Sequence, residues 1–131
     1  MPIDVMWDTP EQTAVRMVYG AQWNVQDFEA AYLETRRLMD TVPHVVDIIT
    51  DVSATSLFPS DGLLGVIRVV QKAPPTAPNT GSVVIVGASP MLKAMSSVQT
   101  RVLKGVREHY VSTMEEAHQY LAEQRAARAD S

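Results

Sequence analysis

Residues 47–70, DIITDVSATSLFPSDGLLGVIRVV, contain the pattern that decides the fold class. Val45 to Thr50 are mostly Val and Ile, which predicts a strand covered by helices on both faces, as in a parallel or mixed sheet. A loop of small polar residues follows, and Ser60 is placed to cap a helix that starts near Asp61 and Gly62. Open α/β sheets bind ligands at the carboxyl ends of their strands, so we expect the functional site in this loop.

Length and composition are those of one globular domain over residues 1–131. The chain is 46% hydrophobic and contains no cysteine, which excludes disulfides, thiol nucleophiles and thiolate metal sites. The first residues lack the pattern of a signal peptide, and no apolar run approaches the roughly 18 residues of a membrane span. We therefore expect a cytoplasmic protein without a membrane span.

The net charge of −4 is unevenly distributed. Residues 1–65 hold 10 acids and 3 bases, whereas residues 66–131 hold 5 acids and 8 bases. Four of these bases share one face of a predicted helix: Lys93, Arg101, Lys104 and Arg107. They form either a solvated face or a weak surface for an acidic partner. We expect no nucleic-acid binding, because the domain is acidic overall and these bases have no interleaved aromatic residues.

The first 40 residues predict a hairpin followed by a helix. Two stretches of alternating side chains predict the hairpin strands: Ile3–Trp7 and Thr13–Tyr19. Asn24 can cap a helix over about residues 25–40, with Asp27 completing a capping box. Trp23 and Phe28 occupy the two positions of a hydrophobic staple. Stacking on a ligand is the alternative role for Trp23, but the staple accounts for it without a further assumption.

Asp47 is an unusual residue inside a strand of Val and Ile. A buried carboxylate without a partner is costly in free energy. We therefore place Asp47 near the start of the strand and expect a hydrogen-bond partner, which the sequence does not identify.

The remaining chain alternates helices and strands. The predicted elements are a helix over residues 63–72, a strand over 82–86, a helix from 90 to about 104, an edge strand over 107–111 and a last helix. Ser89 is the cap of the middle helix, with Pro90 at its first position. Ser112 or Thr113 opens the last helix, and we expect residues 122–131 to fray because the apolar stripe ends at Ala122.

The predicted order is β-β-α-β-α-β-α-β-α, an α/β fold with a mixed sheet and about four packed helices. From about residue 3 to residue 122 the chain resembles the STAS domain of sulfate transporters and anti-sigma-factor antagonists, and most closely its SpoIIAA-like branch. In that family an Asp-Leu-Ser ends the third strand, and an Asp-Ser-Ser-Gly-Leu opens the second helix after a short loop. Here Asp51-Val52-Ser53 is followed at the same separation by Pro59-Ser60-Asp61-Gly62-Leu63.

The resemblance implies a non-catalytic regulatory module that binds a protein partner such as an anti-sigma factor or a kinase. In anti-sigma-factor antagonists the serine directly after the motif's aspartate is phosphorylated by a partner kinase, and by position that serine is Ser60. A phosphate at a helix N-terminus is favourable, because backbone N–H groups can receive its charge. Two motif positions differ here, since Pro59 replaces the aspartate and Asp61 replaces the second serine. The partner-binding candidates are Asp51, Ser53, Phe58, Pro59, Asp61, Gly62 and Ser89.

Other functional classes have weaker support in the sequence. His44, His109 and His118 lack the spacing of a metal site or a catalytic triad, and no Gly-rich phosphate loop is present. We therefore predict no enzyme activity, no cofactor and no metal. The alternative is a small-molecule or lipid-binding protein with an apolar pocket near Phe58. Its candidate lining is Leu57, Phe58, Met91, Met95 and the two tryptophans, which also suit a closed core. A homodimer formed through an edge strand is left open.

Overall fold

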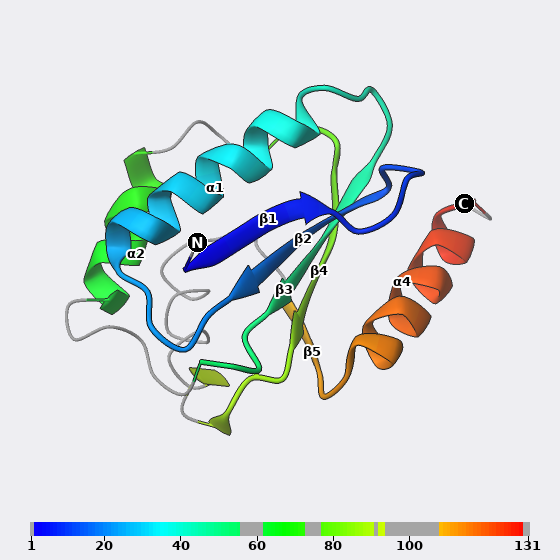
Figure 1. The fold of residues 1–131 in the computed structure, drawn as a ribbon. Coiled ribbons are helices and arrows are strands. Elements are labelled where there is room, and N and C mark those ends of the chain that lie inside the picture. Colours follow the sequence, from blue (N-terminus) through cyan, green and yellow to red (C-terminus); the bar gives the residue numbers. More distant parts are fainter. Residues whose placement is uncertain (1, 56–61, 73–76, 91, 94–107, 130–131) are drawn as a thin grey trace.

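The computed structural model describes residues 2–55, 62–72, 77–90, 92–93 and 108–129 (Figure 1). Within these residues, five strands form one mixed sheet in the order β1-β2-β3-β4-β5. Their bounds are Ile3–Trp7 (β1), Ala14–Tyr19 (β2), Val46–Asp51 (β3), Thr80–Val86 (β4) and Glu108–Val111 (β5). β1 pairs antiparallel with β2, and the other neighbouring pairs are parallel. The predicted α/β class and mixed sheet are confirmed.

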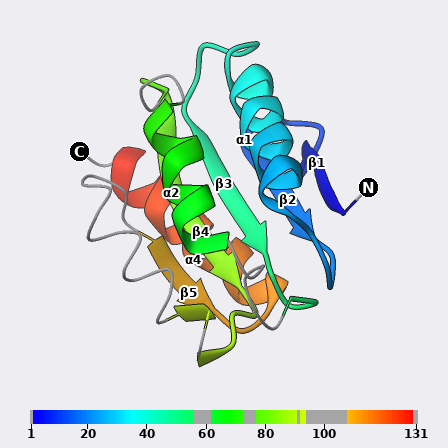
Figure 2. The ribbon, with the colours of Figure 1, turned by 90° about the vertical axis from the view of Figure 1, so that its left-hand side faces the viewer.

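In the described part of the chain, three helices pack on the two faces of this sheet. Their bounds are Val25–Met39 (α1), Gly62–Lys72 (α2) and Met114–Ala129 (α4). α1 and α2 lie on one face and α4 lies on the opposite face (Figures 1 and 2). A further helical turn begins at Pro90, and the rest of the helix expected up to about residue 104 lies outside the described residues. None of the helices in the described part of the chain combines the length and apolar character that crossing a membrane requires.

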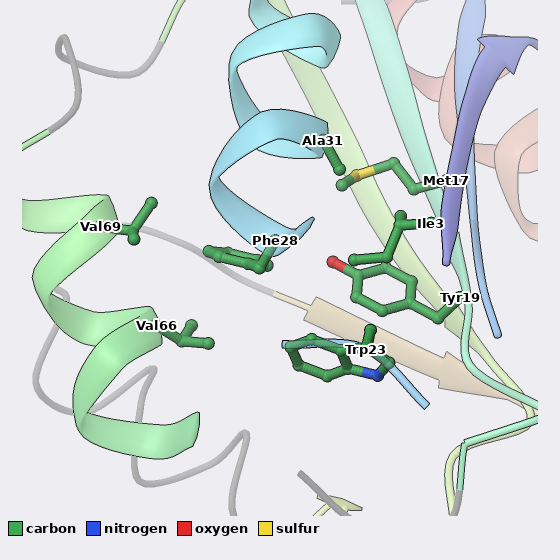
Figure 3. Close-up of a cluster of buried hydrophobic side chains, with 8 residues drawn as sticks. All are labelled: Ile3, Met17, Tyr19, Trp23, Phe28, Ala31, Val66 and Val69. Atoms are coloured by element: carbon green, nitrogen blue, oxygen red, sulfur yellow. The ribbon is translucent and has the colours of Figure 1, made fainter. Parts of the chain in front are cut away.

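The largest buried cluster lies between the sheet and the pair α1 and α2. Tyr19 and Trp23 pack edge to face with ring centroids 5.2 Å apart, and Trp23 lies 6.3 Å from Phe28. Val66 and Val69 of α2 close the cluster from the other side (Figure 3). Trp23 is therefore a core residue in contact with Phe28, as the predicted staple requires.

Local sequence signals fix most element boundaries. The Asn24 side chain accepts a hydrogen bond from the Asp27 N–H at 2.8 Å, and the Asp27 carboxylate accepts one from the Asn24 N–H at 2.9 Å. This is the predicted capping box of α1. Before α4, the Thr113 hydroxyl accepts from the Glu116 N–H at 3.1 Å. The predicted hairpin is also confirmed, with Ile3 opposite Tyr19 and Trp7 opposite Val15.

The prediction that the chain frays after Ala122 is wrong for residues 122–129, because α4 continues to Ala129. The apolar stripe does end, since Ala117 and Leu121 are the buried residues of this helix. The last turns are held by charge, because Arg125 and Arg128 both bind the carboxylate of Asp47 in β3. A tertiary ion pair thus replaces the missing hydrophobic contact.

Candidate functional site

The carboxyl ends of three parallel strands meet at one edge of the sheet. Asp51 ends β3 and lies opposite Val86, the last residue of β4. Val86 in turn lies opposite Val111, the last residue of β5. Beyond the strands the backbone pairing continues, since the Val52 N–H donates to the Val86 carbonyl at 3.0 Å and the Gly87 N–H donates to the Val111 carbonyl at 2.9 Å. The segments after β3 and β4 are therefore held in fixed positions.

Asp51 and Ser53 form a hydrogen-bonded turn at this edge. One carboxylate oxygen of Asp51 accepts from the Ser53 N–H at 3.0 Å and from the Ser53 hydroxyl at 2.6 Å. This is the Asx-type turn that an aspartate favours when its side chain bonds the backbone two residues later. Ser53 is exposed and Asp51 is half-buried, so the turn presents polar groups to solvent.

Gly87 allows the β4 exit to approach this turn closely. It has a φ of 75°, in the left-handed region that favours glycine. A Cβ atom built on Gly87 would lie 2.6 Å from the Cβ of Ser53 and 2.9 Å from its Cα. Only glycine therefore fits between the two strand exits, which fixes the position of the Ser53 backbone.

Thr55 anchors the same loop to the neighbouring strand exit. Its side chain is buried, and its hydroxyl donates to the carbonyl of Gly20 at 2.5 Å. Gly20 follows β2 directly, and its N–H donates to the Pro2 carbonyl at 2.7 Å. The first half of the candidate loop is thus attached to β1 and β2 as well as to β4.

Ser89 is confirmed as a helix cap two residues after Gly87. Its hydroxyl accepts from the Leu92 N–H at 3.2 Å, and its carbonyl accepts from the Lys93 N–H at 2.9 Å. Pro90 takes the first helical position, where a missing N–H leaves no hydrogen bond unmade. The structure thus brings Asp51 and Ser53 into contact and places Ser89 on the next strand exit.

The other predicted site residues divide into two groups. Gly62 is buried and is the first residue of α2, as expected for the helix that follows the loop. Phe58, Pro59, Ser60 and Asp61 lie outside the described residues, and so does the pocket expected near Phe58.

Sequence reasoning missed an ion cluster at the opposite edge of the sheet. Asp47 is fully buried and receives hydrogen bonds from Arg125 Nε at 2.9 Å and Arg128 Nη1 at 3.1 Å. Its carboxylate also accepts from the Ser82 N–H at 2.8 Å, and a Cβ on Gly81 would collide with it. The sequence does contain one indication of this cluster, the i,i+3 spacing of Arg125 and Arg128. This spacing places both guanidinium groups on one face of a helix.

A second carboxylate joins α4 to the hairpin. Asp8 follows β1, and its nearly buried side chain pairs with Arg16 of β2, whose Nε donates at 2.9 Å. The same carboxylate lies 2.9 Å from Nε2 of His118 in α4. This histidine therefore contacts a carboxylate of the fold, and the contact attaches α4 to the hairpin.

Burial shifts the pKa of two side chains on the strands, Glu108 and Tyr19. It raises the pKa of Glu108 on β5 above the ordinary value of 4.5, although a hydrogen bond from Tyr110 partly opposes the shift. Burial also raises the pKa of the Tyr19 phenol, with a smaller contribution from the charge of Glu108. In both side chains burial disfavours the charged form.

The described part of this edge contains polar side chains that are bonded within the fold. In this part of the chain no three His, Asp or Glu side chains gather closely enough to hold a metal ion. Asp51 and Ser53 are engaged with one another, and Ser89 is engaged in capping. Ser53 is exposed, whereas Asp51 and Ser89 are half-buried.

Comparison with known proteins leaves the family open. No protein-family model matches the sequence, and no curated protein matches it significantly. Any functional inference therefore rests on the residues and on the fold.

Proposed function

We propose that this chain is a non-catalytic regulatory interaction domain of the STAS type, in the manner of the anti-sigma-factor antagonists. The partner is a protein of the anti-sigma-factor or kinase kind, and it binds the sheet edge formed by Asp51, Ser53 and Ser89 together with the loop that leads into α2. Phosphorylation of Ser60 switches this binding.

The observation that carries the proposal is the rigid Asp51–Ser53 turn at the end of β3. Its Ser53 is exposed and its Asp51 is half-buried at the carboxyl edge, where open α/β folds recognise ligands. Gly87 and Thr55 fix the turn from two neighbouring strand exits, so a partner meets a preformed surface. A preformed surface loses little conformational entropy on binding.

The element order supports the same proposal. In the described residues the hairpin is followed by α1, β3, α2, β4, β5 and α4, and the strands lie in the sheet in their order along the chain. The resemblance to STAS domains implies this order with one more helix between β4 and β5, and that segment lies largely outside the described residues. α2 begins at Gly62, two residues after Ser60, so a phosphate on Ser60 would stand close to the positive end of a helix.

The proposal is tested by intact-mass spectrometry on protein purified from its native host under several growth conditions. The wild-type protein should carry a phosphate-sized addition that is lost in Ser60→Ala. Ser53→Ala and Ser89→Ala are the matched controls, because each removes a hydroxyl from the same edge and should keep the addition. A wild-type protein without the added mass contradicts the Ser60 switch. An addition that survives in Ser60→Ala contradicts it as well.

A further inference from the structure

The outer face of α1 and α2 contains a groove that is separate from the Asp51–Ser53 turn. The two helices lie side by side on one face of the sheet (Figure 2), and both run antiparallel to the strands that they connect. They therefore run parallel to each other. The groove between them has a volume of about 410 Å³, and its lining includes Val25, Glu29, Leu64, Arg68 and Lys72.

The contact between Gly65 and Val25 sets the relative height of the two helices. A Cβ on Gly65 would lie 2.5 Å from a methyl group of Val25, so the helices touch at this level. One helical turn is about 3.6 residues. Glu29, four residues after Val25, and Arg68, three residues after Gly65, therefore both lie about one turn further along. Glu29 and Arg68 therefore stand at nearly the same height on opposite sides of the groove.

The charged side chains that line the groove differ from their neighbours on α1. Within the described part of the chain, the side chains of Glu29, Arg68 and Lys72 take part in no ion pair or hydrogen bond. On the same helix as Glu29, Glu34 pairs with Arg37 and Arg36 pairs with Asp40.

Two large apolar side chains are exposed on the same two helices. Leu64 of α2 is 66% exposed and Leu33 of α1 is 48% exposed. Apolar groups and unpaired charges together on one face are typical of an interaction surface.

We propose that this face binds a second copy of the same chain in a symmetric dimer. A two-fold axis that runs along the groove places α1 of each copy over α2 of the other, at the same height. Glu29 of each copy then faces Arg68 of the other, and the contact occurs twice. A two-fold interface is self-complementary in this manner, since the same patch meets itself. An acidic partner of another kind would pair with Arg68 and Lys72 but would leave Glu29 beside a like charge.

The size of the face sets the strength of the association. The 15 residues of α1 span about 22 Å at about 1.5 Å per residue. Two packed helices are about 20 Å wide, so the face that each copy contributes has an area of roughly 400 Å². A stable interface buries about 800 Å² per partner. The interface is about half that size, so we expect the association to be weak. This inference does not depend on the proposed function.

Sedimentation velocity over a wide micromolar range tests the dimer. The wild-type chain should shift from monomer to dimer as its concentration rises. Glu29→Arg and Arg68→Glu should each weaken the association at least tenfold, because each creates two like-charge contacts across the axis. The double variant, with both substitutions in one chain, should regain the wild-type dissociation constant, since the charges are exchanged. Glu123→Arg on the opposite helix α4 is the control and should dimerise like the wild type.

Circular dichroism of each variant separates loss of the dimer from loss of the fold. The three substituted positions are exposed and helical, so the spectra of all four variants should be unchanged. A wild-type chain that stays monomeric at the highest concentration overturns the proposal. So does a double variant that is no better than the weaker single variant.

Discussion

At the scale of single residues, Asp47 joins two parts of the chain that are far apart in the sequence. It has no exposed surface, and its partners Arg125 and Arg128 lie 78 and 81 residues away. A buried carboxylate is tolerated only with charge partners and hydrogen bonds, and here two guanidinium groups and the Ser82 N–H provide them. The sequence therefore predicted that a partner exists. It could not identify that partner, because no local pattern connects β3 with α4.

Asp47→Ala should lower the free energy of unfolding by about 2–4 kcal/mol, because it leaves the Ser82 N–H unpaired and removes both ion pairs. The two arginines are partly exposed and can turn to solvent, which keeps the loss below that of a fully buried pair. Urea unfolding measures the change. Asp40→Ala is the control, since Asp40 is in an exposed i,i+4 pair with Arg36 and its loss should cost about 0.5 kcal/mol or less. Equal losses in the two variants would contradict the role of Asp47.

The raised pKa of Glu108 leads us to expect that the stability of the fold depends on pH. Burial raises the pKa of its carboxyl above the ordinary 4.5, so the folded state holds the proton more tightly than the unfolded chain does. The resulting stabilisation is complete below the ordinary pKa and is lost as the pH rises through the raised pKa. Glu108→Gln cannot ionise and can still accept the hydrogen bond from Tyr110.

The stability of Glu108→Gln relative to the wild type should therefore increase between about pH 4 and about pH 7. Urea unfolding at the two pH values measures this difference. Glu123→Gln on the exposed side of α4 serves as the control and should show a smaller change. If the stability of Glu108→Gln relative to the wild type falls as the pH rises, the folded state favours the ionised carboxylate over the neutral acid. That outcome would contradict the prediction.

At the scale of elements, local signals predicted helix starts well and one helix end poorly. The caps at Asn24, Ser89 and Thr113 form within three residues along the chain, so the sequence contains all the information that they need. The end of α4 depends on a tertiary contact with β3, which the sequence does not display. The candidate site likewise combines a local feature with one that depends on tertiary contacts. The Asp51–Ser53 turn is local, whereas its close approach to Gly87 depends on strand pairing.

The double variant Arg125→Ala/Arg128→Ala should release the last turns of α4. Both substitutions favour helix by intrinsic propensity, so any loss of order there comes from the lost contact with Asp47. Amide hydrogen exchange should show lower protection over residues 122–129 and little change in α1. Protection that stays at the wild-type level in both helices would mean that the ion pairs do not hold this segment.

At the scale of the whole molecule, the described helices lie on both faces of the sheet. α1 and α2 cover one face, whereas within the described residues α4 alone covers the other (Figure 1). The sequence predicted the order of the described elements and the mixed sheet, because periodicity and turn residues report each element separately. It could not assign each helix to a face, since that depends on how the chain crosses the sheet. The face under α4 contains a cluster of small and branched side chains: Ala14, Ile49, Val84, Val86, Ala117 and Leu121.

A chain that ends at residue 112 should therefore lose cooperative folding. Without α4 the buried side chains of Ile49 and Val84 become solvent-exposed, and the carboxylate of Asp47 loses both arginines. Thermal unfolding followed by circular dichroism should be broad, and the chain should bind a hydrophobic dye. A synthetic peptide of residues 113–131 should restore a sharp transition, because it returns the apolar contacts of Leu121 together with the ion pairs. The same peptide with Arg125→Ala and Arg128→Ala should bind more weakly, and a sharp transition of the shortened chain alone would contradict this account of the fold.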